Sequence, residues 1–196
     1  MGIDEVEIGE FDDEWTYVAC FGEPCKSCGT RDLHTSSIVI SVDGACSGNG
    51  TADAFMAAGV FFGTNSWYNR SLPLDGPSVT NQVAELRAGI IALELAMDIW
   101  WEERFGEEGN QRLREVVIKA DSEYLVKGMT DYIYKWKQNG FLTTKRTPVT
   151  NRELFEELEA LVNELNGMGI DVYFWHVPRS FNQSADRLAK MASKQA

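Results

Sequence analysis

From residue 37 onward, apolar runs typical of buried strands alternate with segments whose apolar residues have the spacing of an amphipathic helix. Residues 37–42 form a β-branched run, which is typical of a buried strand. Between residues 80 and 101 the apolar side chains are spaced three or four apart, which predicts a long helix packed on a sheet. The positions that carry this spacing are Val83, Leu86, Ile90, Leu93 and Met97.

The same patterns predict the remaining elements. Further strands are expected at residues 57–62, 66–72, 113–120 and 170–177. Further helices are expected at residues 122–129, 151–165 and 183–194. Three successive strands joined by short turns favour an antiparallel meander. The alternating helices and strands that follow favour parallel strands connected by crossover helices. We therefore predict an α/β fold with a five-stranded mixed sheet, its first three strands antiparallel, and helices on both faces.

The first 36 residues differ from the rest. Residues 1–14 contain seven acidic residues and no Lys or Arg, and residues 20–34 are rich in turn formers. We expect an acidic, turn-rich extension over residues 1–36, of which residues 1–14 add nothing to the core, followed by one folded domain over residues 37–196.

Composition and charge narrow the functional classes. A chain of 196 residues with 44% hydrophobic and 24% charged residues fits one domain. The net charge of −12 restricts any nucleic-acid contact to a local basic patch. No apolar run or leader pattern predicts a membrane span or a secretory signal. The four cysteines all lie in the first quarter of the chain, so we expect an intracellular, reducing compartment, nucleus or cytosol.

Four carboxylates follow strands or lie on helices. Asp43 and Asp121 end apolar strands, Glu85 lies one turn into the long helix, and Asp186 lies in the last helix. Singly, they fit a turn, an N-cap, a helix surface and an ion pair with Arg187 or Arg179. Jointly they favour a hard cation such as Mg²⁺ or Mn²⁺. A pair of such ions about 4 Å apart suits phosphodiester hydrolysis.

Residues 38 to about 194 resemble the type 1 ribonuclease H family. The matching segments are VDGACSGNG (42–50), TNQVAELRA (80–88), ADSEY (120–124), WKQNG (136–140) and NQSADRLA (182–189). The resemblance implies a ribonuclease H-like fold and an endoribonuclease that cleaves the RNA strand of RNA–DNA hybrids with two Mg²⁺ ions, leaving a 5′-phosphate; Mn²⁺ is expected to substitute. It implies that Asp43 bridges both ions, that Glu85 and Asp121 complete the site activating water, and that Asp186 serves the leaving group.

The resemblance also implies substrate-binding residues. Asn49, Asn81 and Gln82 would read ribose 2′-OH groups and base edges, and Thr80 and Asn151 would hold a phosphate of the DNA strand. Trp136 lies in a segment in which Lys residues and aromatic residues alternate, and which resembles the family's DNA-binding basic protrusion. The alternatives are a helix cap around Thr80 and an amphipathic helix pair with Trp136 in the core.

The match departs from the family at two places. Most catalytic members have a loop His before the last Asp, whereas His176 here is better explained as a strand end, and Ser78 stands where an Arg often holds a DNA phosphate. These departures keep open an alternative function: a module that binds RNA–DNA hybrid or double-stranded RNA with weak or no turnover. A domain derived from a retroelement polyprotein would share the chemistry.

The N-terminal extension contains a separate candidate site. Cys20, Cys25, Cys28 and His34 supply three thiols and one imidazole, a ligand set that suits tetrahedral Zn²⁺. The spacing is compressed and no second knuckle follows, so we favour the alternative of four unrelated loop residues.

Overall fold

A computed structural model describes residues 7–9, 14–20, 22–23, 26, 31–48, 54–76, 78–106 and 112–192. Its main sheet has five strands in the order β6-β5-β4-β7-β8. These strands are β4 (Ser37–Ser47), β5 (Phe55–Phe61), β6 (Arg70–Leu74), β7 (Glu115–Ala120) and β8 (Asp171–His176). The first three pair antiparallel, and β7 and β8 add in parallel to β4, so the predicted mixed sheet is confirmed.

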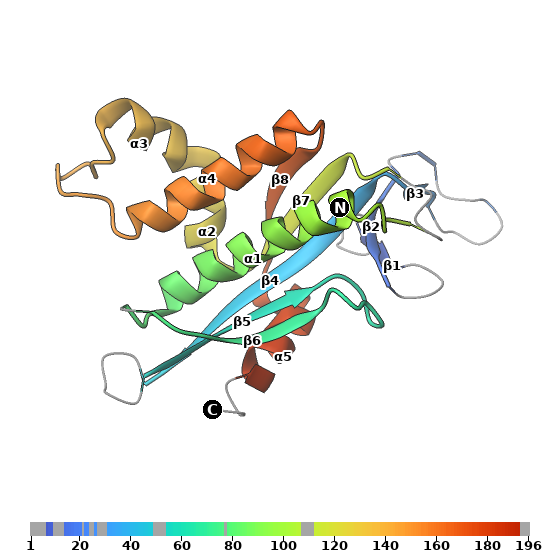
Figure 1. Cartoon of the computed structure of the whole chain (residues 1–196), viewed down its shortest axis with the longest axis horizontal. Helices are drawn as coiled ribbons and strands as arrows, with labels where there is room; N and C mark the ends of the chain where they lie inside the picture. Colours follow the sequence, from blue (N-terminus) through green and yellow to red (C-terminus); the bar gives the residue numbers. More distant parts are fainter. Residues whose placement is uncertain are drawn as a thin grey trace.

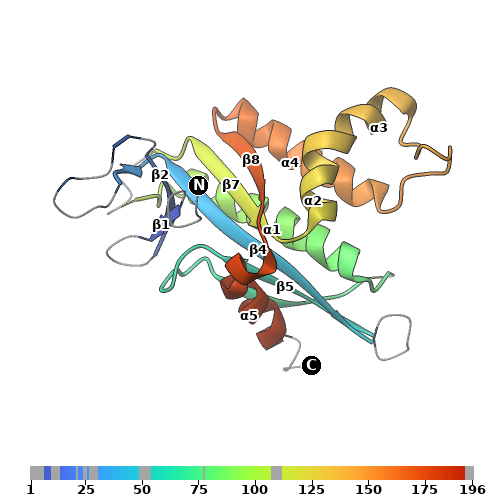
Figure 2. The ribbon, with the colours of Figure 1, turned by 180° about the vertical axis from the view of Figure 1, so that it is seen from behind.

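Helices cover both faces of this sheet. Five α-helices are described: α1 (Asn81–Trp101), α2 (Glu123–Lys127), α3 (Ile133–Asn139), α4 (Arg152–Gly167) and α5 (Gln183–Ala192). Figure 1 shows α1 and α4 side by side in front of the sheet, and Figure 2 shows α5 alone on the opposite face. The predicted α/β class with helices on both faces is therefore confirmed. Within the described ranges, no helix is long and apolar enough to cross a membrane.

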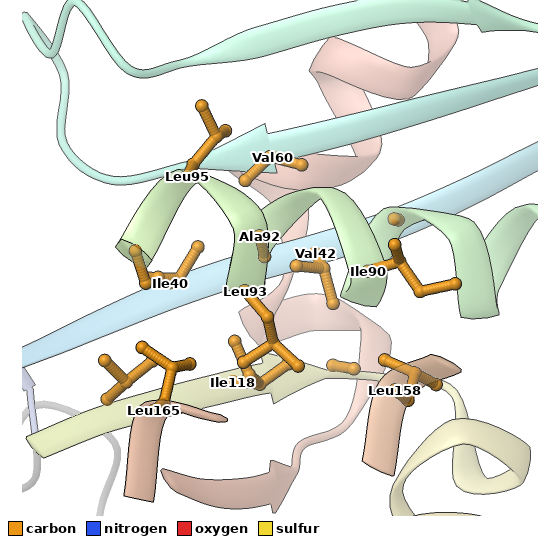
Figure 3. Close-up of a cluster of buried hydrophobic side chains, with 14 of the residues drawn as sticks. Ile40, Val42, Val60, Ile90, Ala92, Leu93, Leu95, Ile118, Leu158 and Leu165 are labelled. Carbon is orange, nitrogen blue, oxygen red and sulfur yellow. The ribbon is translucent and has the colours of Figure 1, made fainter. Parts of the chain in front are cut away.

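The main core lies between the sheet and the layer formed by α1 and α4. Leu93 of α1 points between Ile118 of β7 and the α4 residues Leu158 and Leu165 (Figure 3). Because α1 contacts β4 on one side and α4 on another, its buried positions extend well around the helix. The spacing in the sequence therefore predicts the helix correctly, but it understates how much of the surface of α1 is buried.

Most predicted boundaries hold within a few residues, and the differences have local causes. Strand β6 begins at Arg70 rather than near residue 66, because the preceding residues form a turn stabilised by Asn69. The Asn69 side chain accepts from the Phe62 N–H at 2.8 Å and donates to the Gly63 carbonyl at 2.6 Å. Helix α2 ends at Lys127, where the chain continues as a π-helix over Gly128–Tyr132.

The N-terminal region forms a second sheet that the sequence analysis does not predict. Strands β1 (Glu7–Gly9), β2 (Thr16–Ala19) and β3 (Leu33–His34) pair in that order, antiparallel. Trp15 and Tyr17 are 1% and 0% exposed and belong to the main hydrophobic core. The core therefore extends into the region assigned to the N-terminal extension, because two large aromatic side chains are buried there.

Candidate active site

Asp43 lies on the central strand β4 and is almost fully buried, with 3% of its surface exposed. Its partner on the neighbouring strand β5 is Gly59. Directly opposed residues of an antiparallel pair share a face of the sheet. A Cβ at Gly59 would lie 2.2 Å from the Ala185 carbonyl oxygen in α5. Asp43 therefore points to the face of the sheet that α5 covers.

Glu85 reaches the end of β4 from helix α1. It is 6% exposed, and its Oε2 accepts a hydrogen bond from the Gly44 N–H at 3.2 Å. Asn81 Nδ2 donates to the other oxygen, Oε1, at 3.3 Å. A Cβ at Gly44 would lie 2.2 Å from the Glu85 backbone nitrogen, so only glycine allows α1 to approach β4 this closely.

Asp121 directly follows β7, the parallel neighbour of β4. The pairing of Val42 with Ala120 brings the residues that follow them, Asp43 and Asp121, to the same part of the sheet. Asn182 Nδ2 donates to Asp121 Oδ1 at 2.9 Å. The charge of Asp121 raises the pKa of both Asp43 and Glu85, which places all three carboxylates within electrostatic range.

Asp186 lies in the first turn of α5 and binds two basic side chains. Arg179 Nη2 donates to Oδ1 at 2.5 Å, and Lys190 Nζ donates to Oδ2 at 2.7 Å. Burial alone raises the pKa of Asp186, but the hydrogen bonds from Lys190 and Arg179 outweigh it and the net shift is downward. Asp186 is therefore the carboxylate of this group that is stabilised in its ionised form.

The two most buried carboxylates are destabilised as anions. Burial, followed by the charges of Asp121 and Asp186, raises the pKa of Asp43 from 3.8 to about 7. Burial and the charges of Asp43 and Asp121 raise the pKa of Glu85 from 4.5 to about 8, although hydrogen bonds from Gly44 and Asn81 act in the opposite direction. Desolvated like charges of this kind are relieved either by a proton or by a cation.

A cavity of about 330 Å³ opens onto this group. Three of the four predicted carboxylates line it, together with one predicted substrate residue and two basic side chains. These residues are Asp43, Glu85, Asp186, Asn81, Arg179 and Lys190. The structure therefore brings residues from β4, α1 and α5 to one surface, whereas Asp121 does not line the cavity and is hydrogen-bonded to Asn182.

The carboxylates are not arranged as a finished coordination sphere. In the part of the chain that the structure describes, no three His, Cys, Asp or Glu side chains lie close enough together to hold one metal ion. The contacts of Asp186 with Arg179 and Lys190 give one reason, because both of its oxygens are engaged. The donor set itself, four carboxylates, has the chemistry that Mg²⁺ or Mn²⁺ requires.

Two residues of this site carry no assignment from the sequence. Lys190 lies four residues after Asp186, and this helical spacing is the signal that could have identified it. Asn182 is 1% exposed and precedes α5, where an Asn is ordinarily explained as a helix cap. Its contact with Asp121 depends on β7 and could not be read from local sequence.

The predicted substrate residues are distributed around the start of α1 and beyond it. Thr80 caps α1 by accepting from the Val83 N–H at 3.2 Å, so the capping alternative describes its contact here. Asn81 and Gln82 are exposed in the first turn. Asn49 lies outside the described residues. Asn151 precedes α4 with a φ of 59° and donates to the Tyr124 hydroxyl at 3.4 Å.

Trp136 packs on the core while keeping part of its surface exposed. Its ring meets that of Phe155 edge-on at 4.9 Å and lies 5.6 Å from Tyr132. The alternative of Trp136 as a packing residue is therefore largely correct. Its role in binding DNA stays a prediction, supported by the exposed Tyr134 and Lys135 on the same helix.

The loop before α5 contributes an arginine rather than a histidine to the site. His176 is the last residue of β8, which confirms that it ends a strand. A short 3₁₀ turn, Arg179–Phe181, then leads to α5. Arg179, not His176, therefore contacts the last carboxylate, Asp186, from this loop.

Ser78, the second departure from the family pattern, is exposed and precedes α1.

The zinc hypothesis is tested only in part. Cys25 and Cys28 lie outside the described residues. Cys20 follows β2, and His34 lies on the neighbouring strand β3, where its Nδ1 is 3.9 Å from Glu115 Oε2. Zinc binding by Cys20, Cys25, Cys28 and His34 stays a prediction.

The sequence of this chain is similar to those of ribonucleases H. The chain matches the RNase H family over residues 35–194. A ribonuclease H of Schizosaccharomyces pombe is 32% identical over 172 residues, covering 85% of this chain and 59% of that protein. Ribonuclease H1 of Homo sapiens is 32% identical over 163 residues, covering 81% of this chain and 51% of that protein. The chain thus spans little more than half the length of these two relatives.

Solved structures agree with this similarity. LC11-RNase H1, solved in complex with an RNA/DNA hybrid, superposes with a TM-score of 0.51 at 23% identity, over 80% of this chain and 96% of that chain. This likeness concerns the fold. The family match covers most of the chain and includes all four predicted carboxylates, three of which line the cavity. This chain therefore belongs to the RNase H family.

Proposed function

We propose that this protein is a metal-dependent endoribonuclease that hydrolyses the RNA strand of RNA–DNA hybrids and leaves a 5′-phosphate. The observation that carries the proposal is the convergence of Asp43, Glu85 and Asp186 from three different elements on one cavity, with Asp121 within electrostatic range of Asp43 and Glu85. Burying several like charges is costly, and a fold keeps such an arrangement where a cation or a phosphate is handled.

The four carboxylates would hold the divalent ions of the family, two Mg²⁺, with Mn²⁺ as a substitute. Oxygen ligands suit these hard ions, and the high pKa values of Asp43 and Glu85 are those of a site whose negative charges lack a cation. When bound, such ions polarise the scissile phosphodiester and lower the pKa of the attacking water.

The chain's own cations would act at the same place. Metal binding by Asp186 would compete with its contacts to Arg179 and Lys190 and would favour exchange of one of them. The released guanidinium or ammonium would then face the cavity that it already lines, where a phosphate oxygen is its natural partner. Arg179 and Lys190 thus supply positive charge in a protein of net charge −12.

Recognition of the hybrid would use donors at the cavity and the basic-aromatic segment. Asn81 lines the cavity and Gln82 is exposed beside it in sequence, so both amides are placed to address ribose hydroxyls. Thr80 and Asn151 would contact phosphate, and Trp136 with Lys135 would contact the DNA strand. LC11-RNase H1 carries an RNA/DNA hybrid in its solved complex, and we extend that substrate class to this chain.

A second candidate is a binding module with weak or no turnover. The observation in its favour is that both oxygens of Asp186 already bind basic side chains. If these contacts keep Asp186 from binding a metal, the site lacks one ligand and the fold binds hybrid or double-stranded RNA without cutting it.

We also propose that residues 37–196 form the RNase H domain and that residues 1–36 form an acidic extension attached to it. The family match, which begins at residue 35, supports the division. The packing of Trp15 and Tyr17 shows only that the extension shares the core of this domain.

Cleavage of an end-labelled RNA–DNA hybrid tests the proposal. We expect cutting in Mg²⁺ or Mn²⁺, no cutting in chelator, and no cutting of matched double-stranded RNA or DNA. Asp43→Asn and Asp121→Asn are each expected to reduce the rate by at least about 100-fold, because each removes a charged ligand from the site. Asp171→Asn, an exposed carboxylate at the opposite end of β8, is the matched control.

Three other outcomes have distinct meanings. Metal-independent cutting, or cutting that survives Asp43→Asn, would contradict the proposed site. Salt-dependent binding of the hybrid without cutting would select the binding module.

A further inference from the structure

Asn182 occupies an unusual position for a buried amide. It lies between the 3₁₀ turn and α5, and it is 1% exposed. Its backbone carbonyl accepts from the Asp186 N–H at 3.1 Å, the first hydrogen bond of α5. By backbone geometry it is therefore the N-cap residue of the helix that carries Asp186.

The side chain of Asn182 does not cap that helix. An N-cap Asn ordinarily uses Oδ1 to accept from an N–H of the first turn. Within the residues that the structure describes, Asn182 Oδ1 has no hydrogen-bond partner. Its Nδ2 instead donates to the Val42 carbonyl at 2.8 Å and to Asp121 Oδ1 at 2.9 Å. The side chain is thus directed into the active site, and the capping contact of α5 is given up.

The orientation of this amide is fixed by its partners. The Val42 carbonyl oxygen and Asp121 Oδ1 both accept from Nδ2, so turning the amide over would place Oδ1 against an oxygen. Only the observed orientation provides both hydrogens where they are accepted. A buried amide held in this way restricts the Asp121 carboxylate to one direction.

These contacts connect three of the four carboxylates through one residue. Asn182 binds Asp121 directly, binds the residue before Asp43, and begins the helical turn that carries Asp186. We propose that Asn182 is a positioning residue, which sets the relative placement of Asp43, Asp121 and Asp186 for divalent metal binding. This inference rests on the proposed function.

The test measures metal binding without substrate. We expect Asn182→Ser to weaken binding of Mn²⁺, followed by the metal-induced rise in Tm, by about 10- to 100-fold, as for other partners that orient metal ligands. Serine is chosen because its hydroxyl can cap α5 but is too short to reach both acceptors. Asn69→Ser is the control, because Asn69 makes two hydrogen bonds in the turn before β6. It should lower the Tm and leave Mn²⁺ affinity unchanged.

A double-mutant cycle separates positioning from general damage. Asp121→Ala removes the one carboxylate that Asn182 contacts directly, so Asn182→Ser should change Mn²⁺ affinity by a smaller factor in that background than in the wild type. A full effect there, or wild-type Mn²⁺ affinity in the single variant, would overturn the inference.

A measurement on the unmutated chain covers the case in which the variant does not fold. The Asn182 side-chain amide resonances should exchange slowly with solvent and shift on titration with Mg²⁺. Resonances that exchange freely, or that ignore Mg²⁺, would contradict the assignment.

The two proposals fail separately. If the wild-type chain binds Mn²⁺ and Asn182→Ser weakens that binding, but no hybrid is cut, the inference holds and the endoribonuclease does not. If the hybrid is cut and Asn182→Ser binds Mn²⁺ like wild type, only the inference is lost.

Discussion

Asp43 and Glu85 are carboxylates in an interior built for apolar side chains. They are 3% and 6% exposed, and their closest charged neighbours include further carboxylates. Such groups weaken the fold when they ionise, because the folded state opposes their charge and the unfolded state does not. The burial of Asp43 and Glu85 therefore indicates a role in chemistry rather than in stability.

This burial predicts how stability depends on pH in chelator. The pKa of Asp43 is about 7 in the folded protein against 3.8 as its ordinary value, so the folded state binds the proton more tightly. Its contribution to stability is present in full below about pH 4 and is lost as the pH rises through 7. Asp43→Asn should therefore raise the Tm at pH 8.5 by roughly 4 to 10 °C and change it little at pH 4.

Thermal unfolding at both pH values checks this prediction. Asp171→Asn removes a charge far from the site and serves as the control. An Asp43→Asn variant that is less stable than wild type at pH 8.5 in chelator would show that Asp43 is not destabilised as an anion. Saturating Mg²⁺ should reverse the order, because the ion stabilises only the protein that retains the carboxylate.

Helix α5 is held on the sheet by backbone contact rather than by large side chains. Its buried residues are Ala185, Ala189 and Ala192, and it lies against Gly59 of β5. Ser71 of β6 also donates to the Leu188 carbonyl at 2.7 Å. Small residues on both sides set the distance between α5 and the sheet, and thereby the position of Asp186.

Gly59→Ala tests this close approach. The new Cβ would lie 2.2 Å from the Ala185 carbonyl oxygen and 2.5 Å from the Ala189 nitrogen, so α5 has to move. We expect a loss of about 1–3 kcal/mol in the free energy of unfolding and a weaker response to Mg²⁺. Gly167→Ala is the matched control, because a Cβ there meets nothing within 4 Å. Equal stabilities of the two variants in urea unfolding would contradict the prediction.

At the scale of the whole molecule, the main core of the described residues reaches back into the N-terminal region. Trp15 contacts Phe62 and Phe105 edge-on, at 6.2 and 5.5 Å between ring centroids. Lys119 on β7 is 5% exposed and binds Glu7 of β1 through both carboxylate oxygens, at 2.8 and 2.6 Å. Described residues before residue 37 are therefore packed against or bonded to the main domain.

Truncation of one tryptophan measures that contribution. Trp15→Ala should cost about 3–5 kcal/mol, because it removes a fully buried ring, and should lower the Tm by roughly 10 °C. Trp67→Ala is the control, because Trp67 is 88% exposed, and its effect should stay within about 0.5 kcal/mol. Similar Tm values for the two variants would show that the N-terminal packing adds little.

Local sequence was sufficient for what depends on neighbouring residues. The period of apolar positions predicted α1 and α4, and the β-branched runs predicted β4 and β7, because burial of one face imposes those repeats. The positions of Asp43, Glu85, Asp121 and Asp186 at strand ends and in helices followed from the same patterns. Their motif context led to the RNase H family, which the family match shows.

Contacts between distant segments required the folded chain. The turn-rich segment before residue 37 has no clear hydrophobic period. The burial of Trp15 and Tyr17 therefore depends on the tertiary contact between β2 and β4 and could not be predicted from the sequence. From the sequence alone Asn182 is explained as a helix cap, and only the folded chain shows its hydrogen bond to Asp121, which follows β7. The contacts of Asp186 with Arg179 and Lys190 likewise depend on how the short loop enters α5. Periodicity records which face is buried, whereas the partner of a buried polar group is set by tertiary packing.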